Sequence, residues 1–225
     1  MSLPTSLPPA LFVTGTDTEI GKTASSAALL HALRRRGLRA VGMKPVASGS
    51  QDLGHGLRNE DALALQAASW PVPDYADLNP YALRQPLAPE LAAAEDGVEV
   101  QLAPIVAAFE RLRAQADVVV VEGVGGWLAP VSATLDQLDL VRALRLPVLL
   151  VVGMRLGCVN HARLTAQSLQ ASGVDCLGWI GNHIDPTMQR QDANFATLQQ
   201  RLPMPCWGRL PHLPGADAQV LSSHL

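Results

Sequence analysis

A glycine-rich segment near the N-terminus carries the residue types that bind phosphate. Residues 15–23 read Gly-Thr-Asp-Thr-Glu-Ile-Gly-Lys-Thr and stand between the apolar run 11–13 and a helical pattern over 24–36. In a strand–loop–helix of this kind, backbone N–H groups surround the phosphates, and the lysine and threonine reach a phosphate oxygen and magnesium. Five residues separate the glycines instead of the usual four. The alternative is an ordinary glycine turn that happens to be followed by a lysine. The flanking strand and helix favour a phosphate loop instead, in which the side chains of Lys22 and Thr23 bind the ligand.

Two carboxylates stand where they could complete a magnesium site with Thr23. Glu122 ends the valine run 118–121, and an isolated acid there favours a metal ligand over a surface charge. Asp61 lies in the first turn of a helix expected to run through residue 68. Taken alone, Asp61 is typical of a helix N-terminal charge. With Thr23 and Glu122, it would supply three oxygen ligands for one Mg²⁺.

A second lysine follows the second expected strand, residues 39–43. A lysine at such a position is usually a solvated surface charge, and that alternative stays open for Lys44. Lys22 is already expected to bind the phosphates. A second lysine at Lys44 therefore suggests a positive charge that stabilises a group gaining or losing phosphate. Ser48, in the loop that follows, could orient the same group.

The composition limits the class of protein. The chain has 225 residues, of which 48% are hydrophobic and 16% charged, with a net charge of -3. We expect one domain over residues 1–225, with residues 1–9 frayed, and neither nucleic acid nor membrane as a partner. Three widely separated cysteines match no disulfide framework or zinc spacing, so we expect buried thiols in a reducing compartment. With no leader pattern or long apolar run, the expected location is cytoplasmic.

Apolar runs and amphipathic stretches alternate along the chain. This order predicts a single-domain α/β structure of the P-loop NTPase type, with a mostly parallel, doubly wound sheet flanked by helices. Residues 51–58 and 70–89 are expected to be connections, the second an ordered loop on the substrate side. Strands are expected at 11–13, 39–43, 117–121, 147–152, 177–181 and 206–210, and helices at 22–36, 62–68, 102–112, from 160 onward, and 190–201.

Six segments together resemble the dethiobiotin synthetase family. They cover residues 11 to about 185 in the family's order, and their joint occurrence is more specific than the phosphate loop alone. They read Gly-Thr-Asp-Thr-Glu-Ile-Gly-Lys-Thr (15–23), Gly-Met-Lys-Pro-Val-Ala-Ser-Gly (42–49), Arg-Asn-Glu-Asp-Ala (58–62), Asn-Pro-Tyr (79–81), Val-Glu-Gly-Val-Gly-Gly-Trp (121–127) and Gly-Cys-Val-Asn-His (157–161).

The resemblance implies an ATP- and Mg²⁺-dependent cyclo-ligase of biotin synthesis, EC 6.3.3.3. Such an enzyme converts 7,8-diaminopelargonate, CO2 and ATP to dethiobiotin, ADP and phosphate through a carbamate and a carbamic-phosphoric anhydride. It also implies a homodimer in which the helix start at Asn160 receives the substrate's carboxylate tail near the interface. The protein's task in such a reaction is to position and neutralise anions.

The matching positions imply a set of site residues. Lys44 and Lys22 would be catalytic, with Lys44 at the carbamate and the transferred phosphoryl group. Thr18, Ser48 and Asn160 would bind the diamine. Thr23, Asp61 and Glu122 would hold the metal. ATP would contact Glu19, Ile20, Gly21, Lys22, Thr23, Ala24, Asp61, Glu122, Gly123, Val124, Gly125, Asn182, His183, Pro211 and His212, with Asn182 at adenine.

Two positions depart from the family pattern. His183 stands where relatives often have Asp, and Glu90 where they often have His, which leaves the base contacts and the role of the proline-rich loop open.

Three other classes of protein fit the sequence less well. A partitioning-type ATPase usually has a lysine at the position of Asp17. A cobyrinate-type amidoligase normally adds a glutaminase domain, for which we expect this chain to be too short. A binding protein without turnover would not need Lys44.

Overall fold

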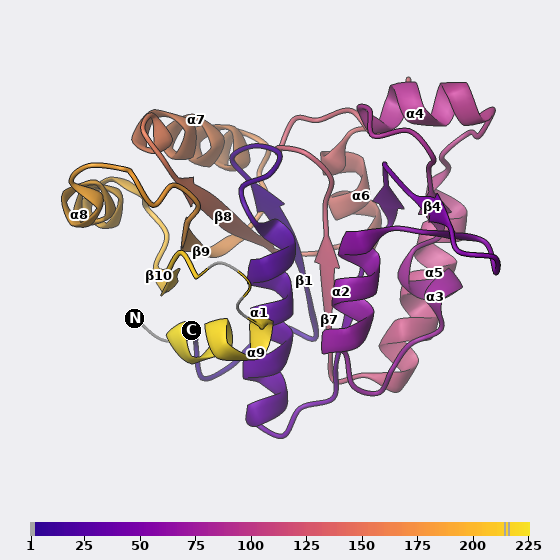
Figure 1. Cartoon of the computed structure of the whole chain (residues 1–225), viewed down its shortest axis with the longest axis horizontal. Helices are drawn as coiled ribbons and strands as arrows, with labels where there is room; N and C mark the ends of the chain where they lie inside the picture. The colour runs from indigo at the N-terminus through magenta and orange to yellow at the C-terminus, as the bar shows by residue number, and fades with distance from the viewer. Residues whose placement is uncertain (1–2, 214, 216) are drawn as a thin grey trace.

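A six-stranded sheet runs through the middle of the protein, and every neighbouring pair of its strands is parallel (Figure 1). The computed structural model describes residues 3–213, 215 and 217–225. The strand order is β10-β9-β8-β1-β7-β2. These strands are β1 (Ala10–Gly15), β2 (Ala40–Met43), β7 (Val118–Glu122), β8 (Val148–Met154), β9 (Cys176–His183) and β10 (Cys206–Leu210). The predicted α/β fold with a parallel sheet is confirmed.

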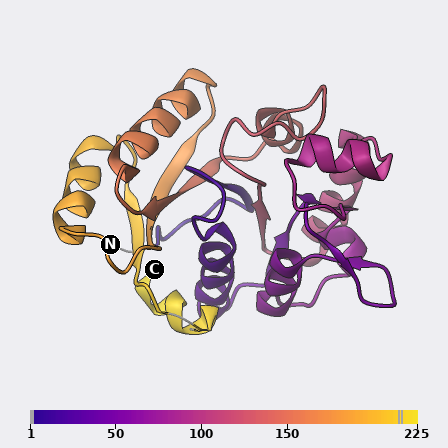
Figure 2. The ribbon, with the colours of Figure 1, turned by 45° about the horizontal axis from the view of Figure 1, so that its top comes forward.

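Helices cover both faces of the sheet, as Figures 1 and 2 show. One face carries α1 (Lys22–Arg35), α2 (Glu60–Ala68) and the short α9 (Ala218–Leu221). The other carries α5 (Leu102–Gln115), α6 (Gln137–Leu144), α7 (Cys158–Ala171) and α8 (Gln191–Arg201). A sheet enclosed in this way needs apolar side chains on both faces, which explains the continuous valine run of β7.

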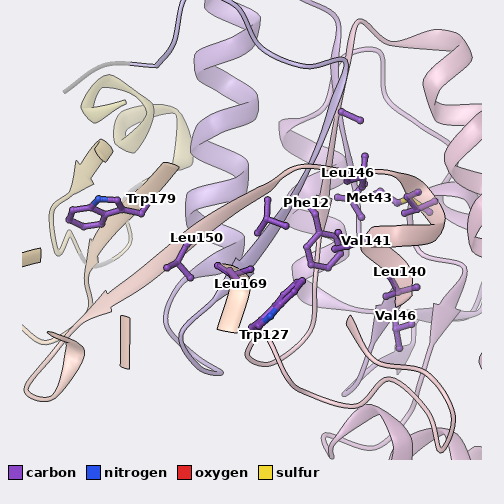
Figure 3. Packing of buried hydrophobic residues seen from close by; sticks show 14 of the residues in the cluster. Phe12, Met43, Val46, Trp127, Leu140, Val141, Leu146, Leu150, Leu169 and Trp179 are labelled. Atoms are coloured by element: carbon purple, nitrogen blue, oxygen red, sulfur yellow. The ribbon is translucent and has the colours of Figure 1, made fainter. Parts of the chain in front are cut away.

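Alternate residues of β1 enter two separate hydrophobic clusters. Leu11 and Val13 point toward α1 and α2, whereas Phe12 points toward the opposite layer. Figure 3 shows Phe12 beside Val141 of α6, with Trp127 nearby. Because β1 is central and buried throughout, the loop that follows it is anchored from both sides of the sheet.

The proline-rich connection contains more regular structure than predicted. Residues 70–89 include α3 (Tyr75–Leu78) and β6 (Tyr81–Ala82), and β6 pairs in parallel with β3 (Val46–Ala47). Pro89 is the first residue of α4 (Pro89–Asp96), a position where the missing N–H costs nothing. A proline that looked like a breaker in the sequence therefore starts a helix.

Several other boundaries differ from the predictions. Residues 51–58 form a hairpin of β4 (Gln51–Asp52) and β5 (Leu57–Arg58). Helix α7 begins at Cys158, two residues before the predicted start at Asn160. Asn182 lies inside β9 and not after it, because β9 stays paired with β8 as far as His183. The sequence reading also missed α6, α9 and the 3-10 turn Ser222–His224.

The ends of the chain and the cysteines give two further outcomes. Residues 1 and 2, where fraying was expected, lie outside the described residues, whereas Leu3 is buried against the core. The three cysteines were expected to be buried thiols. Cys158 is buried, as expected. The expectation is wrong for Cys176 and Cys206, which are partly exposed. Within the described ranges, no helix is long and apolar enough to cross a membrane.

Candidate active site

The loop between β1 and α1 has the backbone shape of a phosphate loop. Gly21, the residue before α1, adopts a left-handed conformation with φ of 79°. A Cβ atom there would overlap the side-chain nitrogen of Asn182, which donates a hydrogen bond to the Ile20 carbonyl at 2.9 Å. Both the backbone angle and the close approach therefore require glycine. Ile20 is buried and anchors the loop to the core.

Lys22 is folded back over its own loop. Its Nζ atom donates to the Asp17 carbonyl at 2.8 Å, and the residue is only 7% exposed. Burial and the nearby charge of Lys44 lower the pKa of Lys22 to about 8. The positive charges of Lys22 and Lys44 therefore repel each other. An anion bound between the two side chains would offset this repulsion.

Lys44 contacts both of the carboxylates, Asp61 and Glu122, that were predicted from the sequence to be metal ligands. Its Nζ atom lies 2.6 Å from Glu122 Oε1 and 3.0 Å from Asp61 Oδ2, with the Gly123 carbonyl at 3.4 Å. Thr23 donates its hydroxyl hydrogen to Glu122 Oε1 at 2.7 Å. Side chains from β2, α2, β7 and α1 therefore meet at the carboxyl edge of the sheet, where open α/β sheets bind ligands.

Mutual attraction favours the charged forms of Lys44 and Asp61. Burial lowers the pKa of Lys44, but the charges of Glu122 and Asp61 outweigh it, so the pKa lies above its ordinary value. For Asp61, burial raises the pKa and Lys44 lowers it more, with a net downward shift. The site thus presents an ammonium group and carboxylates to one another.

The predicted metal ligands fit a hard cation. Thr23, Asp61 and Glu122 supply oxygen atoms, the donor type that Mg²⁺ prefers. Glu122 Oε2 is buried and accepts no hydrogen bond from the part of the chain that the structure describes, so one oxygen is in place for a further partner. Among the described residues, no group of three or more His, Cys, Asp or Glu side chains could hold a metal. A cation here would therefore complete its coordination with oxygens from phosphate and water.

A cavity of about 870 Å³ opens beside these groups. The predicted residues that line it are Thr18, Glu19, Gly21, Lys22, Thr23, Lys44, Ser48, Asp61, Val124 and Gly125. Ser48 Oγ is buried and has no hydrogen-bond partner among the described residues. The sequence did not single out Ala47, Gly126, Ala129, Pro130 or residues 86–89, which also line it. Only the expectation of a substrate-side loop pointed to 86–89.

A second cavity, of about 420 Å³, holds three of the predicted base contacts: His183, Pro211 and His212. His183 Nε2 accepts a hydrogen bond from Arg209 Nε at 2.7 Å. Burial, followed by the charge of Arg209, lowers the pKa of His183. Arg209 also forms an ion pair with Asp192 at 2.6 Å. Arg209 was missed in the sequence analysis, because it meets His183 only through the pairing of β9 with β10.

The remaining predicted residues lie around these cavities. Ile20 and Glu122 are buried beneath the main cavity, and Asn182 packs against the phosphate loop. Gly123 contributes its carbonyl to Lys44. Ala24, in the first turn of α1, lines neither cavity. Asn160 is the third residue of α7, is exposed, and also lies outside both cavities.

Comparison with known proteins gives a consistent picture. A family model described as an AAA domain matches residues 9–220. A protein of Xanthomonas axonopodis pv. citri, named ATP-dependent dethiobiotin synthetase BioD, is 70% identical over 93% of this chain and 94% of its own length. The protein of the same name from Xanthomonas oryzae pv. oryzae is 69% identical over 97% of both chains.

A solved structure, the MinC:MinD cell division protein complex of Aquifex aeolicus, shares the fold with a TM-score of 0.57. The match covers 95% of this chain and 86% of the other, at 13% sequence identity. So distant a likeness shows a shared fold alone.

Proposed function

This chain belongs to the dethiobiotin synthetase family, and we propose that it closes the ureido ring of dethiobiotin from 7,8-diaminopelargonate, CO2 and ATP. The family membership makes the protein an ATP-dependent ligase of biotin biosynthesis. We also propose that the whole chain, residues 1–225, forms a single domain, and that the enzyme works as a homodimer.

One observation carries the reaction assignment. Lys22, at the start of α1, and Lys44, directly after β2, both reach a cavity that Asp61 also lines, and among the described residues the Ser48 hydroxyl on its wall has no hydrogen-bond partner. A partitioning-type switch would carry its second lysine at the position of Asp17, and not after β2 where Lys44 stands. The second lysine is a donor for an additional anion beside the phosphates, and a carbamate is such an anion.

The proposed chemistry has three balanced steps. One amine of the substrate attacks CO2 and loses a proton, which gives a carbamate. A carbamate oxygen attacks the γ-phosphorus of ATP, and ADP leaves with its electron pair. The second amine then attacks the carbamate carbon, closes the five-membered ring, loses a proton and expels phosphate. Each step moves negative charge between oxygens, so the protein acts by positioning and by electrostatics.

Lys44 is the residue proposed to stabilise this negative charge during the reaction. Two of its three N–H bonds are directed at Glu122 and Asp61, and the third has only the Gly123 carbonyl, at 3.4 Å. That long contact is weak, so the third N–H can exchange it for a carbamate or phosphoryl oxygen. Lys22 would exchange the Asp17 carbonyl for a phosphate oxygen in the same way. Thr18 and Ser48, on the wall of the same cavity, would hold the diamine.

Thr23, Asp61 and Glu122 are the residues proposed to hold Mg²⁺. When bound, the ion would neutralise charge on the β- and γ-phosphates. Because Lys44 contacts both carboxylates, it also fixes their orientation. The phosphate-loop backbone from Glu19 to Ala24 would surround the phosphates.

We assign the base of ATP to the cavity lined by His183, Pro211 and His212, next to Asn182. Asn182 already uses its amide N–H on Ile20, which leaves its amide oxygen to accept from the adenine amino group. The loop after β7, including Val124 and Gly125, would lie along the phosphates and the diamine.

The proposal is tested by incubating the protein with ATP, Mg²⁺, bicarbonate and 7,8-diaminopelargonate and analysing the products by mass spectrometry. We expect dethiobiotin and ADP together, and neither when the diamine is omitted. ATP hydrolysis that does not depend on the diamine would favour the partitioning-type switch, although Asp17 stands where such switches carry a lysine.

A further inference from the structure

A buried glutamine from α6 contacts the loop that follows β7. Gln137 is the first residue of α6 and is only 1% exposed. Its side-chain Nε2 atom donates a hydrogen bond to the Val124 carbonyl at 2.5 Å. Val124 and the two glycines after it line the main cavity, whereas Gln137 does not. Gln137, which belongs to none of the residue sets assigned above, therefore reaches the site through a backbone group.

The amide of Gln137 lies directly against this loop. The first turn of α6 is secured by the Asp136 N–H, which donates to Asp139 Oδ2 at 2.8 Å. A Cβ atom at Gly123 would come within 2.8 Å of Gln137 Oε1. Within the described part of the chain, that oxygen is buried and accepts no hydrogen bond, which is costly. An apolar side chain would avoid this cost, so the contribution of the amide lies in its bond to Val124.

The Val124 carbonyl determines where the next N–H group points. Among the described residues the only cis peptide bond is Trp70-Pro71, so the bond between Val124 and Gly125 is trans. In a trans peptide the C=O and N–H groups point in opposite directions. Because the carbonyl points to Gln137, the Gly125 N–H points away from α6. Gly125 lines the main cavity, and a Cβ atom there would lie 3.8 Å from Thr18 Oγ1 of the phosphate loop.

The Gly125 N–H is available to a ligand. In the ranges that the structure describes, it donates to no backbone or side-chain group. Two residues earlier in the same loop, the Gly123 N–H donates to the Val13 carbonyl at 3.0 Å, and the Gly123 carbonyl lies 3.4 Å from Lys44 Nζ. The loop is thus anchored to β1 beside Lys44. A donor on this loop can act on the same anion as the lysine.

We propose that Gln137 is a positioning residue for the phosphoryl group that ATP transfers. By holding the Val124 carbonyl, it keeps the Gly125 N–H turned into the main cavity, where this N–H donates to a γ-phosphoryl oxygen. The inference rests on the proposed function, which places the phosphates of ATP in this cavity beside Lys22 and Lys44. ADP has no γ-phosphoryl group, so its binding should not depend on Gln137.

The test compares ADP with a non-hydrolysable ATP analogue, both with Mg²⁺, by calorimetry. Gln137→Leu removes the hydrogen-bond donor and keeps a side chain of similar size. We expect it to weaken binding of the analogue about tenfold, the loss of one hydrogen bond to a charged group, and to leave the dissociation constant of ADP unchanged. Turnover with saturating substrates should fall about tenfold or more. Unchanged binding of ADP also reports that the variant is folded.

Two further variants separate the hydrogen bond from packing. Gln137→Met also lacks a donor, but its unbranched side chain differs in shape from leucine. The same selective loss in both variants would support the inference, whereas a loss in only one would assign the effect to packing and overturn it. Gln66→Leu is the matched control. Gln66 donates its side-chain amide to the Pro73 carbonyl at 3.0 Å and lies outside the main cavity, so this change should alter neither dissociation constant.

The nucleotide constants decide the inference separately from the proposed function. Equal weakening of ADP and the analogue in the Gln137 variants, or no weakening of either, would overturn the inference alone. A wild-type protein that makes no dethiobiotin would overturn the proposed function, and the ratio of the two constants would still decide the role of Gln137.

Discussion

Lys44 Nζ lies 2.6 Å from Glu122 Oε1, and the two side chains are 3% and 0% exposed. Taking both charges out of water carries a desolvation cost that their attraction repays only with good geometry and further hydrogen bonds. Thr23 and Asp61 supply those additional contacts. A buried pair is weak evidence for stability, so we interpret this one as a means of placing charge at the cavity.

Replacing Lys44 should lower turnover, and it should also reduce the free energy of unfolding because Glu122 loses its partner inside the protein. Lys44→Gln keeps a hydrogen-bond donor near Glu122 but removes the positive charge. We expect turnover to fall on the order of 10²-fold or more, because a charge that stabilises the transition state is lost. Binding of ATP should be retained. Single-turnover kinetics give the test, and an unchanged rate would remove Lys44 from the mechanism.

Asp61 offers a test of the metal assignment, because its side chain is 48% exposed and can be changed with little effect on the core. We expect Asp61→Asn to raise the Mg²⁺ concentration that gives half-maximal activity, since an amide is a weaker ligand than a carboxylate. Asp117→Asn is the matched control: it changes an exposed ion pair with Arg39, just before the opposite end of β7. Equal magnesium dependence in the two variants would argue against Asp61 as a ligand.

Gly21 and Gly37 provide a matched pair for the phosphate loop. Both have positive φ, 79° and 82°, but a Cβ atom at Gly21 would overlap Asn182, whereas one at Gly37 would meet nothing within 4 Å. Gly37→Ala should cost about 1 kcal/mol in the free energy of unfolding, from backbone strain alone. Gly21→Ala should cost more and abolish nucleotide binding. Denaturant unfolding and calorimetry check both effects. Retained nucleotide binding in Gly21→Ala would mean that the loop does not need this shape.

The proposed homodimer predicts complementation between subunits. If Asn160 lies in one subunit and Lys44 of the same site in the other, a heterodimer of Asn160→Ala and Lys44→Gln chains contains one site with neither change. Mixing two inactive variants should then restore part of the activity. The heterodimer can be isolated with two affinity tags before it is assayed. No recovery in isolated heterodimers would indicate that each site is built from one chain.

The sequence predicted those features that depend on local pattern. The valine run before Glu122 predicted a buried strand, and the segment from Gly15 to Thr23 predicted the phosphate loop, because each carries its own signature of apolar runs and glycines. The convergence of Lys44 with Glu122 followed from the rule that parallel strands end at one edge.

The features that were missed depend on tertiary contacts. Helix α4 begins at Pro89, and only the completed fold shows that this proline starts a helix rather than ending one. The pairing of Asp17 with Arg155 joins positions 138 residues apart, and no spacing rule relates them. The hydrogen bond from Arg209 to His183 likewise needs β10 to lie beside β9.

Phosphate should leave carrying one oxygen of the carbamate, and the transfer of an ¹⁸O label tests this step. The protein is mixed in ordinary water with ATP, Mg²⁺, 7,8-diaminopelargonate and freshly added C¹⁸O2. One carbamate oxygen should depart with phosphate and the other should remain in the ureido carbonyl, so the two products should carry equal ¹⁸O label. Labelled dethiobiotin accompanied by unlabelled phosphate would contradict the account, because ATP would then have been cleaved without phosphorylating the carbamate.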